Sequence, residues 1–322
     1  MKGVDGVRYD PLDYLYASAR IRAMEGRLVG RERLNQLLSA QTVSDAEKML
    51  DEWGASKGQE YGLKGAFAAV EESLPDRSLL HFLQYPYDCH NLKTLEKCRI
   101  KGTDPERLLI DLGSVPTEIL LTVSENELLS RLPTHMAQAV APARDAFAKT
   151  GDPQELDFIF DRAAYADMAA AAAPYPFAAE LVGTQADLIN LMMCLRLLRM
   201  QNGELGRSVL TRAALPAGTL DELFLLDLYD GGEEAFYKRL SATPYEAVFA
   251  KDRTLADTEK RADDHLMALI RRARYVTFGA EVPIAYLLAA ERQSKNLRIL
   301  LVGKAAGLDA QAIQTRMRES YV

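Results

Sequence analysis

Asp88-Cys89-His90-Asn91-Leu92 is the first of three segments that share an Asn-Leu pair with a glycine eleven or thirteen residues further on. The second segment is Asp187-Leu188-Ile189-Asn190-Leu191, and the third is Lys295-Asn296-Leu297, where Gln293 replaces the aspartate. The three asparagines are 99 and 106 residues apart, whereas common helical repeats are roughly 33 to 47 residues long. This spacing predicts three homologous helical bundles, over residues 1–105, 106–205 and 206–322.

Each of these asparagines stands in an otherwise apolar helical pattern. An amide buried without a partner costs on the order of 1–3 kcal/mol, so we expect each amide to bind a neighbouring helix or a terminal carbonyl. We therefore predict a repeated packing device, with direct ligand binding as the alternative. The candidate repeat-signature residues are Asp88, Asn91, Asp187, Asn190 and Asn296.

Helix-start signals recur along the chain. Asp10 and Asp152 each precede a proline at a first helical position, and Ser124 stands three residues before a glutamate. Thr243-Pro244 repeats the signal. Apolar residues then follow at steps of three and four, as in the run Tyr14, Ala17, Ile21, Met24 and Leu28. Sustained alternation of β-branched residues is absent, so we predict an all-α fold.

Composition limits the function classes. The 322 residues include 39 basic and 46 acidic side chains, net charge −7, without the basic cluster typical of nucleic-acid binding. Three cysteines are too few for a disulfide framework and favour a reducing compartment. The N-terminus lacks the apolar core of a signal peptide, and prolines interrupt the apolar stretch 168–183. These features predict a cytoplasmic protein that does not cross a membrane.

Motifs that carry chemistry are sparse. His81, Cys89, His90 and Cys98 lack the tight spacing of zinc ligands, and neither a P-loop nor a nucleophile elbow occurs. The segment Asp263–Met267 is similar to the aspartate-rich motif of all-α isoprenoid synthases, but its third acid is missing. We predict no catalytic residue, cofactor, metal or small-molecule substrate. A magnesium-dependent diphosphate-processing enzyme and a generic helical scaffold are the alternatives.

Residues in several regions resemble one family. Tyr14–Glu25 resembles the N-terminal helix of the C subunit of V-type/A-type ATP synthases, called the d subunit in eukaryotic V-ATPases. Tyr85, Asp88 and Asn91-Leu92-Lys93 are similar to its first-repeat signature. Leu132-Pro133 and Asp157–Asp161 match its mid-chain helices, and Glu291, Lys295–Ile299 and Gly303-Lys304 resemble its C-terminal signature. The resemblance covers nearly the whole chain.

This resemblance implies a non-catalytic coupling protein. Members of the family are funnel-shaped, with three helical bundles related by a pseudo-threefold axis. The expected partners are the rotor-shaft subunits, of D and F type, on one face and the membrane ion-translocating ring on the other. The resemblance thus implies a cytoplasmic protein peripheral to the membrane, in the central stalk of a proton- or sodium-translocating rotary ATPase.

Overall fold

The computed structural model describes residues 9–55, 62–122, 124–201, 203–251 and 253–322. These residues form helices joined by turns, with no strand among them, which confirms the predicted all-α fold. The chain divides into two compact units. Unit 1 comprises Met1–Arg77 and Lys260–Val322, and unit 2 comprises Ser78–Glu259. The division into three repeats stays a prediction.

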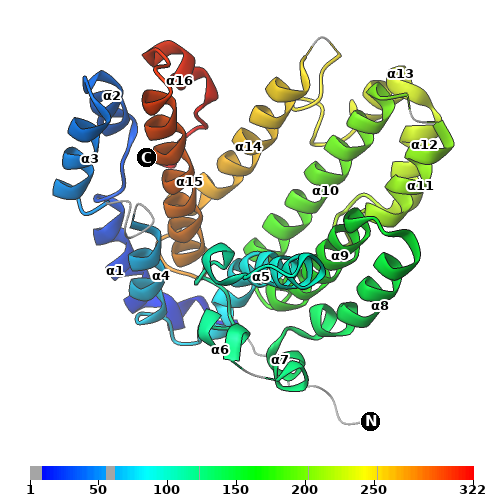
Figure 1. Ribbon diagram of the computed structural model, residues 1–322. Coiled ribbons are helices and arrows are strands. Elements are labelled where there is room, and N and C mark those ends of the chain that lie inside the picture. The colour runs from blue at the N-terminus through cyan, green and yellow to red at the C-terminus, as the bar shows by residue number, and fades with distance from the viewer. Residues whose placement is uncertain (1–8, 56–61, 123, 202, 252) are drawn as a thin grey trace. The chain divides into compact units, whose positions relative to one another are not determined.

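Unit 1 is organised around α15 (Glu281–Ala305). The other elements of this unit are η1 (Pro11–Tyr14), α1 (Leu15–Glu25), α2 (Arg31–Ser39), α3 (Val43–Glu52), α4 (Leu63–Glu71), η5 (Arg272–Tyr275) and α16 (Ala310–Arg316). The boundary between the units falls within α14 (Leu255–Arg271), whose residues from Lys260 onward belong to unit 1. Helices α1 to α4 pack against α15, and so does α16, which Figure 1 shows at its upper end. Buried side chains occur on every turn of α15, as expected for a helix surrounded by others.

Unit 2 contains α9 (Pro153–Ala172) and α10 (Pro176–Arg199) as its central helices. The remaining elements are α5 (His81–Lys101), η4 (Glu106–Leu108), α6 (Thr117–Thr122), α7 (Glu125–Arg131), α8 (Thr134–Thr150), α11 (Gly203–Ala213), α12 (Glu222–Asp230) and α13 (Gly232–Leu240), and η3 (Arg77–Leu80) begins at its boundary. α9 contacts α5, α8, α10 and α11, while α10 also contacts α12 and α13.

Three of the helix starts agree with the capping signals in the sequence. The Asp10 carboxylate accepts a hydrogen bond from the Leu12 amide, and Asp152 and Ser124 cap α9 and α7 in the same way. The expectation at Thr243-Pro244 is wrong, because residues 241–248 form turns. The Thr243 hydroxyl donates to the Leu240 carbonyl at the end of α13, so it does not cap a new helix.

Most of the apolar part of α10 is buried inside unit 2. Among the described residues, α10 is the one helix long and apolar enough to cross a membrane, and 67% of its most apolar window is buried. Core helices of globular proteins share this property.

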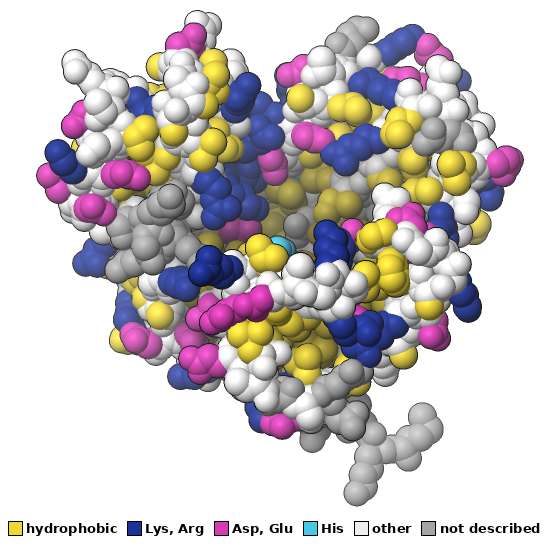
Figure 2. Space-filling view, in the orientation of Figure 1, with side chains coloured by type: hydrophobic (Ala, Val, Ile, Leu, Met, Phe, Trp, Pro, Cys, Tyr) yellow, Lys and Arg dark blue, Asp and Glu magenta, His cyan; other side chains and the backbone are white. Residues whose placement is uncertain are grey.

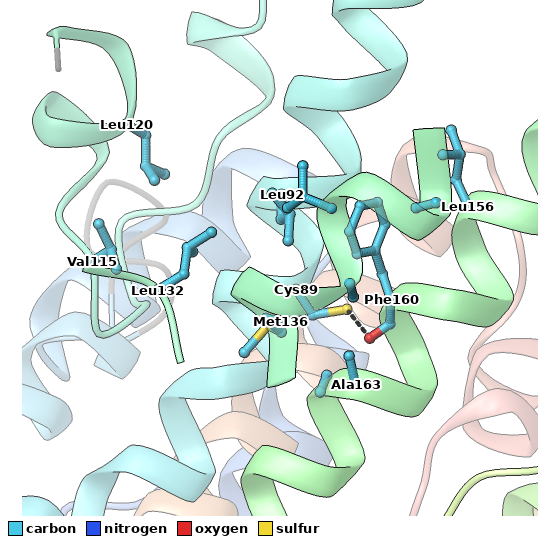
Figure 3. Packing of buried hydrophobic residues seen from close by; sticks show 13 residues of the cluster. Cys89, Leu92, Val115, Leu120, Leu132, Met136, Leu156, Phe160 and Ala163 are labelled. Atoms are coloured by element: carbon cyan, nitrogen blue, oxygen red, sulfur yellow. Dashed lines mark hydrogen bonds between the residues drawn. The ribbon is translucent and has the colours of Figure 1, made fainter. Parts of the chain in front are cut away.

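The core of unit 2 beside α9 is a single apolar cluster from α5, α6, α8 and α9. Phe160 lies at its centre with no exposed surface, between Leu92 of α5 and Leu156 of its own helix (Figure 3). The Cys89 thiol donates a weak hydrogen bond to the Phe160 carbonyl. Because protein interiors are close-packed, removing this ring leaves a cavity.

We expect Phe160→Ala to lower the free energy of unfolding by about 3–5 kcal/mol. Leu223→Ala is the control, because Leu223 is 76% exposed and should change stability by less than about 0.5 kcal/mol. Urea unfolding followed by circular dichroism measures both. Equal effects of the two substitutions would contradict the packing of Phe160.

An ion pair links α5 to α8. The buried carboxylate of Glu96 accepts hydrogen bonds from Arg144 of α8, at 2.6 and 2.9 Å, and from Arg99 one turn away. Burial works to raise the pKa of Glu96, but the two guanidinium groups outweigh it and hold this pKa below its usual value. The pair therefore stabilises the fold when Glu96 is ionised.

Glu96→Gln should lower the stability by about 1–3 kcal/mol at pH 7. Since the folded-state pKa is lowered, this contribution is complete above the unfolded pKa, near 4.5, and is lost as pH falls through the folded value. The difference between wild type and variant should therefore shrink on acidification. Glu127→Gln, which breaks a half-exposed pair with Arg131, should cost less than about 1 kcal/mol. A pH-independent difference in urea unfolding would contradict this role.

Candidate functional site

Asn91 and Asn190 each bind the backbone of a single later residue through two hydrogen bonds. The Asn91 amide nitrogen donates to the Ile110 carbonyl at 2.8 Å, and its oxygen accepts from the Ile110 amide at 2.8 Å. Asn190 forms the same pair with Leu215, at 2.9 and 2.8 Å. We call this arrangement an amide clamp. A planar carboxamide has one acceptor and a donor side by side, so it matches both backbone groups of one residue.

Asn296, on α15 in unit 1, forms a third amide clamp. Its nitrogen donates to the Arg318 carbonyl at 2.9 Å, and its oxygen accepts from the Arg318 amide at 3.0 Å. One turn earlier on this helix, the Gln293 side-chain oxygen accepts from the Val29 amide at 2.7 Å. The third segment therefore has the same asparagine contact, while Gln293, at the position of the aspartate, binds a different part of the chain.

Asp88 lies one turn before Asn91 and binds the same loop. Its carboxylate accepts from the Ser114 amide and hydroxyl, at 2.9 and 2.6 Å, and from the Val115 amide at 3.1 Å. Burial raises the pKa of Asp88, and these hydrogen bonds partly oppose that rise. The carboxylate is thus used to hold backbone.

Asp187 repeats this contact one turn before Asn190. It accepts from the Thr219 amide and hydroxyl, at 3.1 and 2.5 Å, and from the Leu220 amide at 3.0 Å. The Tyr245 hydroxyl adds a further hydrogen bond at 2.6 Å. Burial, followed by the bond to Asp187, raises the pKa of Tyr245, which keeps this hydroxyl protonated as a donor.

The two loops have the same internal register. In each loop the hydroxyl residue held by aspartate follows the residue held by asparagine by four positions, and a glycine stands just before it. An added Cβ at Gly113 would lie 2.2 Å from a carboxylate oxygen of Asp88, and one at Gly218 would lie 2.2 Å from Asp187. Each carboxylate therefore requires glycine at this position. The two loops are Ile110–Val115 and Leu215–Leu220.

The glycines that follow the asparagines all have left-handed backbone. Gly102, Gly203 and Gly307 have φ values of 64°, 50° and 73°, a region that glycine occupies without strain. The apolar residues six positions later differ, because Ile313 is buried whereas Leu108 is 57% exposed. The shared part of the pattern is thus the left-handed glycine, which directly follows α5, follows α15 by two residues and is the first residue of α11.

The cysteines and aspartates that could take part in catalysis are buried or are bound to other groups of the protein. Burial raises the pKa of Cys89 and of Cys194 to about 12, so both thiols are protonated at neutral pH. Asp263 pairs with Arg292 at 3.2 Å and with Arg318 at 2.7 Å, and Asp264 accepts from the Glu319 amide. Within the described ranges, no group of three or more His, Cys, Asp or Glu side chains is placed to hold a metal ion.

Comparison with known proteins identifies the family. The model of the ATP synthase (C/AC39) subunit matches residues 17–316 of this chain. The chain belongs to this family. Among the similar curated proteins, the C subunit of the V-type sodium ATPase of Enterococcus hirae is 24% identical over 329 residues, covering 96% of this chain and 99% of that protein. The C subunits of the A-type ATP synthases of Thermococcus kodakarensis and Methanocaldococcus jannaschii are 23% and 22% identical, covering 95% of this chain in each case and 90% and 86% of those proteins.

Two residues of the C/AC39-like C-terminal signature have structural contacts in unit 1. An added Cβ at Gly303 would lie 2.7 Å from Ile313, so glycine permits the close approach of α16 to α15. The Lys304 ammonium donates to the carbonyls of Leu38 and Ala40, at 2.8 and 2.6 Å, at the end of α2. A cation here satisfies carbonyls that a helix end leaves unpaired.

The sequence predicts the asparagines and aspartates as a shared signature, but it does not predict the residues that they bind. Ser114, Thr219 and Tyr245, which donate to the two carboxylates, are not among the predicted site residues. A signal existed, because Gly113-Ser114-Val115 and Gly218-Thr219-Leu220 share the pattern of glycine, hydroxyl residue and aliphatic residue. The Tyr245 contact leaves no such signal, since it comes from a segment 58 residues away.

Gly218→Ala should lower the free energy of unfolding by about 1–3 kcal/mol, because the new methyl group would displace the Asp187 carboxylate from its buried contacts. Gly65→Ala is the matched control. Nothing lies within 4 Å of its added Cβ in α4, so alanine should raise stability by about 0.5–1 kcal/mol. Thermal unfolding of both variants tests this. Gly218→Ala with unchanged stability would contradict the close approach at Asp187.

Proposed function

We propose that this chain is the central-stalk C subunit of a V-type/A-type rotary ATPase. It couples the rotor shaft of the catalytic head to the membrane ion-translocating ring. The observation that carries the proposal is the similarity, over nearly its full length, to proteins named as the C subunits of a V-type sodium ATPase and of A-type ATP synthases. In this proposal the chain is cytoplasmic and peripheral to the membrane, and its function is ion transport within the complex.

The proposal includes three homologous bundles, over 1–105, 106–205 and 206–322, arranged as a funnel about a pseudo-threefold axis. The three amide clamps support it, since Asn91, Asn190 and Asn296 each lie on a long helix and each bind one later residue in the same way. One face would receive the shaft subunits of D and F type, and the other would contact the ring.

A coupling protein must transmit torque without internal slippage. Close-packed helices transmit strain well. Each clamp attaches a later segment to its long helix through two hydrogen bonds, one to the backbone N–H and one to the backbone C=O of the same residue. The carboxylates of Asp88 and Asp187 serve these loops, which suits a protein without chemistry of its own. ATP hydrolysis and ion passage would belong to other subunits.

The magnesium-dependent enzyme is the weaker candidate. Its key carboxylate would be Asp263, whose oxygens bind Arg292 and Arg318. The guanidinium charges hold the pKa of Asp263 below its usual value although burial alone would raise it. A magnesium ion would have to displace both cations. A generic scaffold would instead co-purify with proteins unrelated to rotary ATPases.

Reconstitution tests the coupling role. The isolated catalytic head should hydrolyse ATP equally with and without this chain, whereas ATP-driven ion pumping by the complete complex should require it. Hydrolysis by the isolated head that depends on this chain would overturn the proposal.

A proline in α15 should reproduce this uncoupling. Leu297 is buried in the helix interior, so Leu297→Pro removes a backbone hydrogen bond and clashes with the preceding turn, at a cost of roughly 3 kcal/mol or more. Ala310→Pro is the control, because position 310 is the first residue of α16, where proline is tolerated. Pumping should fall with Leu297→Pro alone, while hydrolysis by the head is unchanged.

A further inference from the structure

Unit 1 contains an open groove of about 700 Å³ that is rich in positive charge. Its walls come from α2, from α14 and η5, and from the segment after α16. Five basic side chains line it, against the acidic side chains of Asp264 and Glu319. The basic residues are Arg31, Lys260, Arg271, Arg274 and Arg318. Figure 2 shows Lys and Arg side chains gathered over the upper part of unit 1.

Two of the arginines are held in place by carboxylates. Arg271 pairs with Glu319 at 2.5 Å, and the Nε of Arg318 donates to Asp263 at 2.7 Å. A guanidinium has five N–H donors, so each of these side chains keeps donors for a further acceptor. Because both side chains are already fixed, binding a ligand would cost them little conformational freedom.

Two other cations of the groove are not neutralised by the protein. No carboxylate within the described part of the chain lies within ion-pair distance of Arg31 on α2 or of Lys260 on α14. The two acidic side chains of the lining are used elsewhere, because Glu319 pairs with Arg271 and Asp264 accepts from the Glu319 amide. The positive charge of the groove is therefore available to an anion from two walls.

The apolar side chains of the lining offer little surface to a ligand. Leu34, Met317 and Tyr321 are 6%, 8% and 3% exposed. Arg31 and Arg274, by contrast, are exposed. A ligand that depends on apolar contacts would find few here, whereas an anion would contact the charged side chains that face water.

We propose that this groove binds a small soluble anion with two or more adjoining phosphate groups. A single phosphate carries about two negative charges and suits one cluster of donors. Adjoining phosphate groups bring more charge and can contact Arg31 and Lys260 together, from both walls. Small-molecule sites have volumes of roughly 300–1,000 Å³, a range that includes this groove. The inference does not depend on the proposed function.

Titration calorimetry on the full-length chain tests this site. The probes are inorganic triphosphate, orthophosphate and sulfate, at matched ionic strength and without divalent cations. Triphosphate should bind at least about tenfold more tightly than orthophosphate, since only the larger anion spans both walls. Its affinity should fall as salt is raised.

The groove variant is Arg31→Gln with Lys260→Gln, which should weaken triphosphate binding at least about tenfold. The matched control is Lys48→Gln with Arg298→Gln. Both control residues are exposed in unit 1, outside the groove, and the change in net charge is the same. The control should bind triphosphate like wild type. Without ligand, both variants should melt at the wild-type temperature, since none of the four residues has an ion pair to a described residue.

Three results would overturn the proposal. Triphosphate bound no more tightly than sulfate would mean an adventitious ion only. Equal losses in the groove and control variants would mean attraction to overall charge without a site. Binding to vesicles that contain a bisphosphorylated lipid, without binding of free triphosphate, would exclude a soluble ligand.

Discussion

The amide clamp is the interaction that joins each of α5, α10 and α15 to a later segment of the chain. A buried carboxamide must satisfy a donor and an acceptor, and leaving either unpaired costs about 1–3 kcal/mol. In the clamps of Asn91, Asn190 and Asn296 both groups meet the backbone of one residue, which fixes that residue in position and orientation together. Substitution by aspartate would lose the donor, and substitution by leucine would lose both bonds. Two hydrogen bonds therefore join the helix to the later segment at each site.

The carboxylates one turn earlier extend this attachment in unit 2. Asp88 and Asp187 each accept three hydrogen bonds from the matching residues of their loops, and a glycine gives each carboxylate its space. In unit 1 Gln293 instead holds Val29, so the third long helix is joined to an N-terminal segment.

The arrangement also bears on what the protein does. Residues that could suggest catalysis, such as Asp263 and Cys89, are engaged in ion pairs or buried with raised pKa values. The similarity to the C subunits of rotary ATPases agrees with this view.

The sequence alone determined the all-α fold, the caps at Asp10, Ser124 and Asp152, and the repeated asparagines, because periodicity and capping are local properties. Only the tertiary structure decided which residues those side chains bind. The loop bound by Asn91 begins 19 residues away and that bound by Asn190 begins 25 residues away, so no fixed spacing reveals the partner. It also overrode the helix signal at Thr243, whose hydroxyl bonds back to α13 while nearby Tyr245 reaches Asp187. Local signals specify helices, but hydrogen bonds across the fold select the partners of buried polar groups, because burial penalises every group left without one.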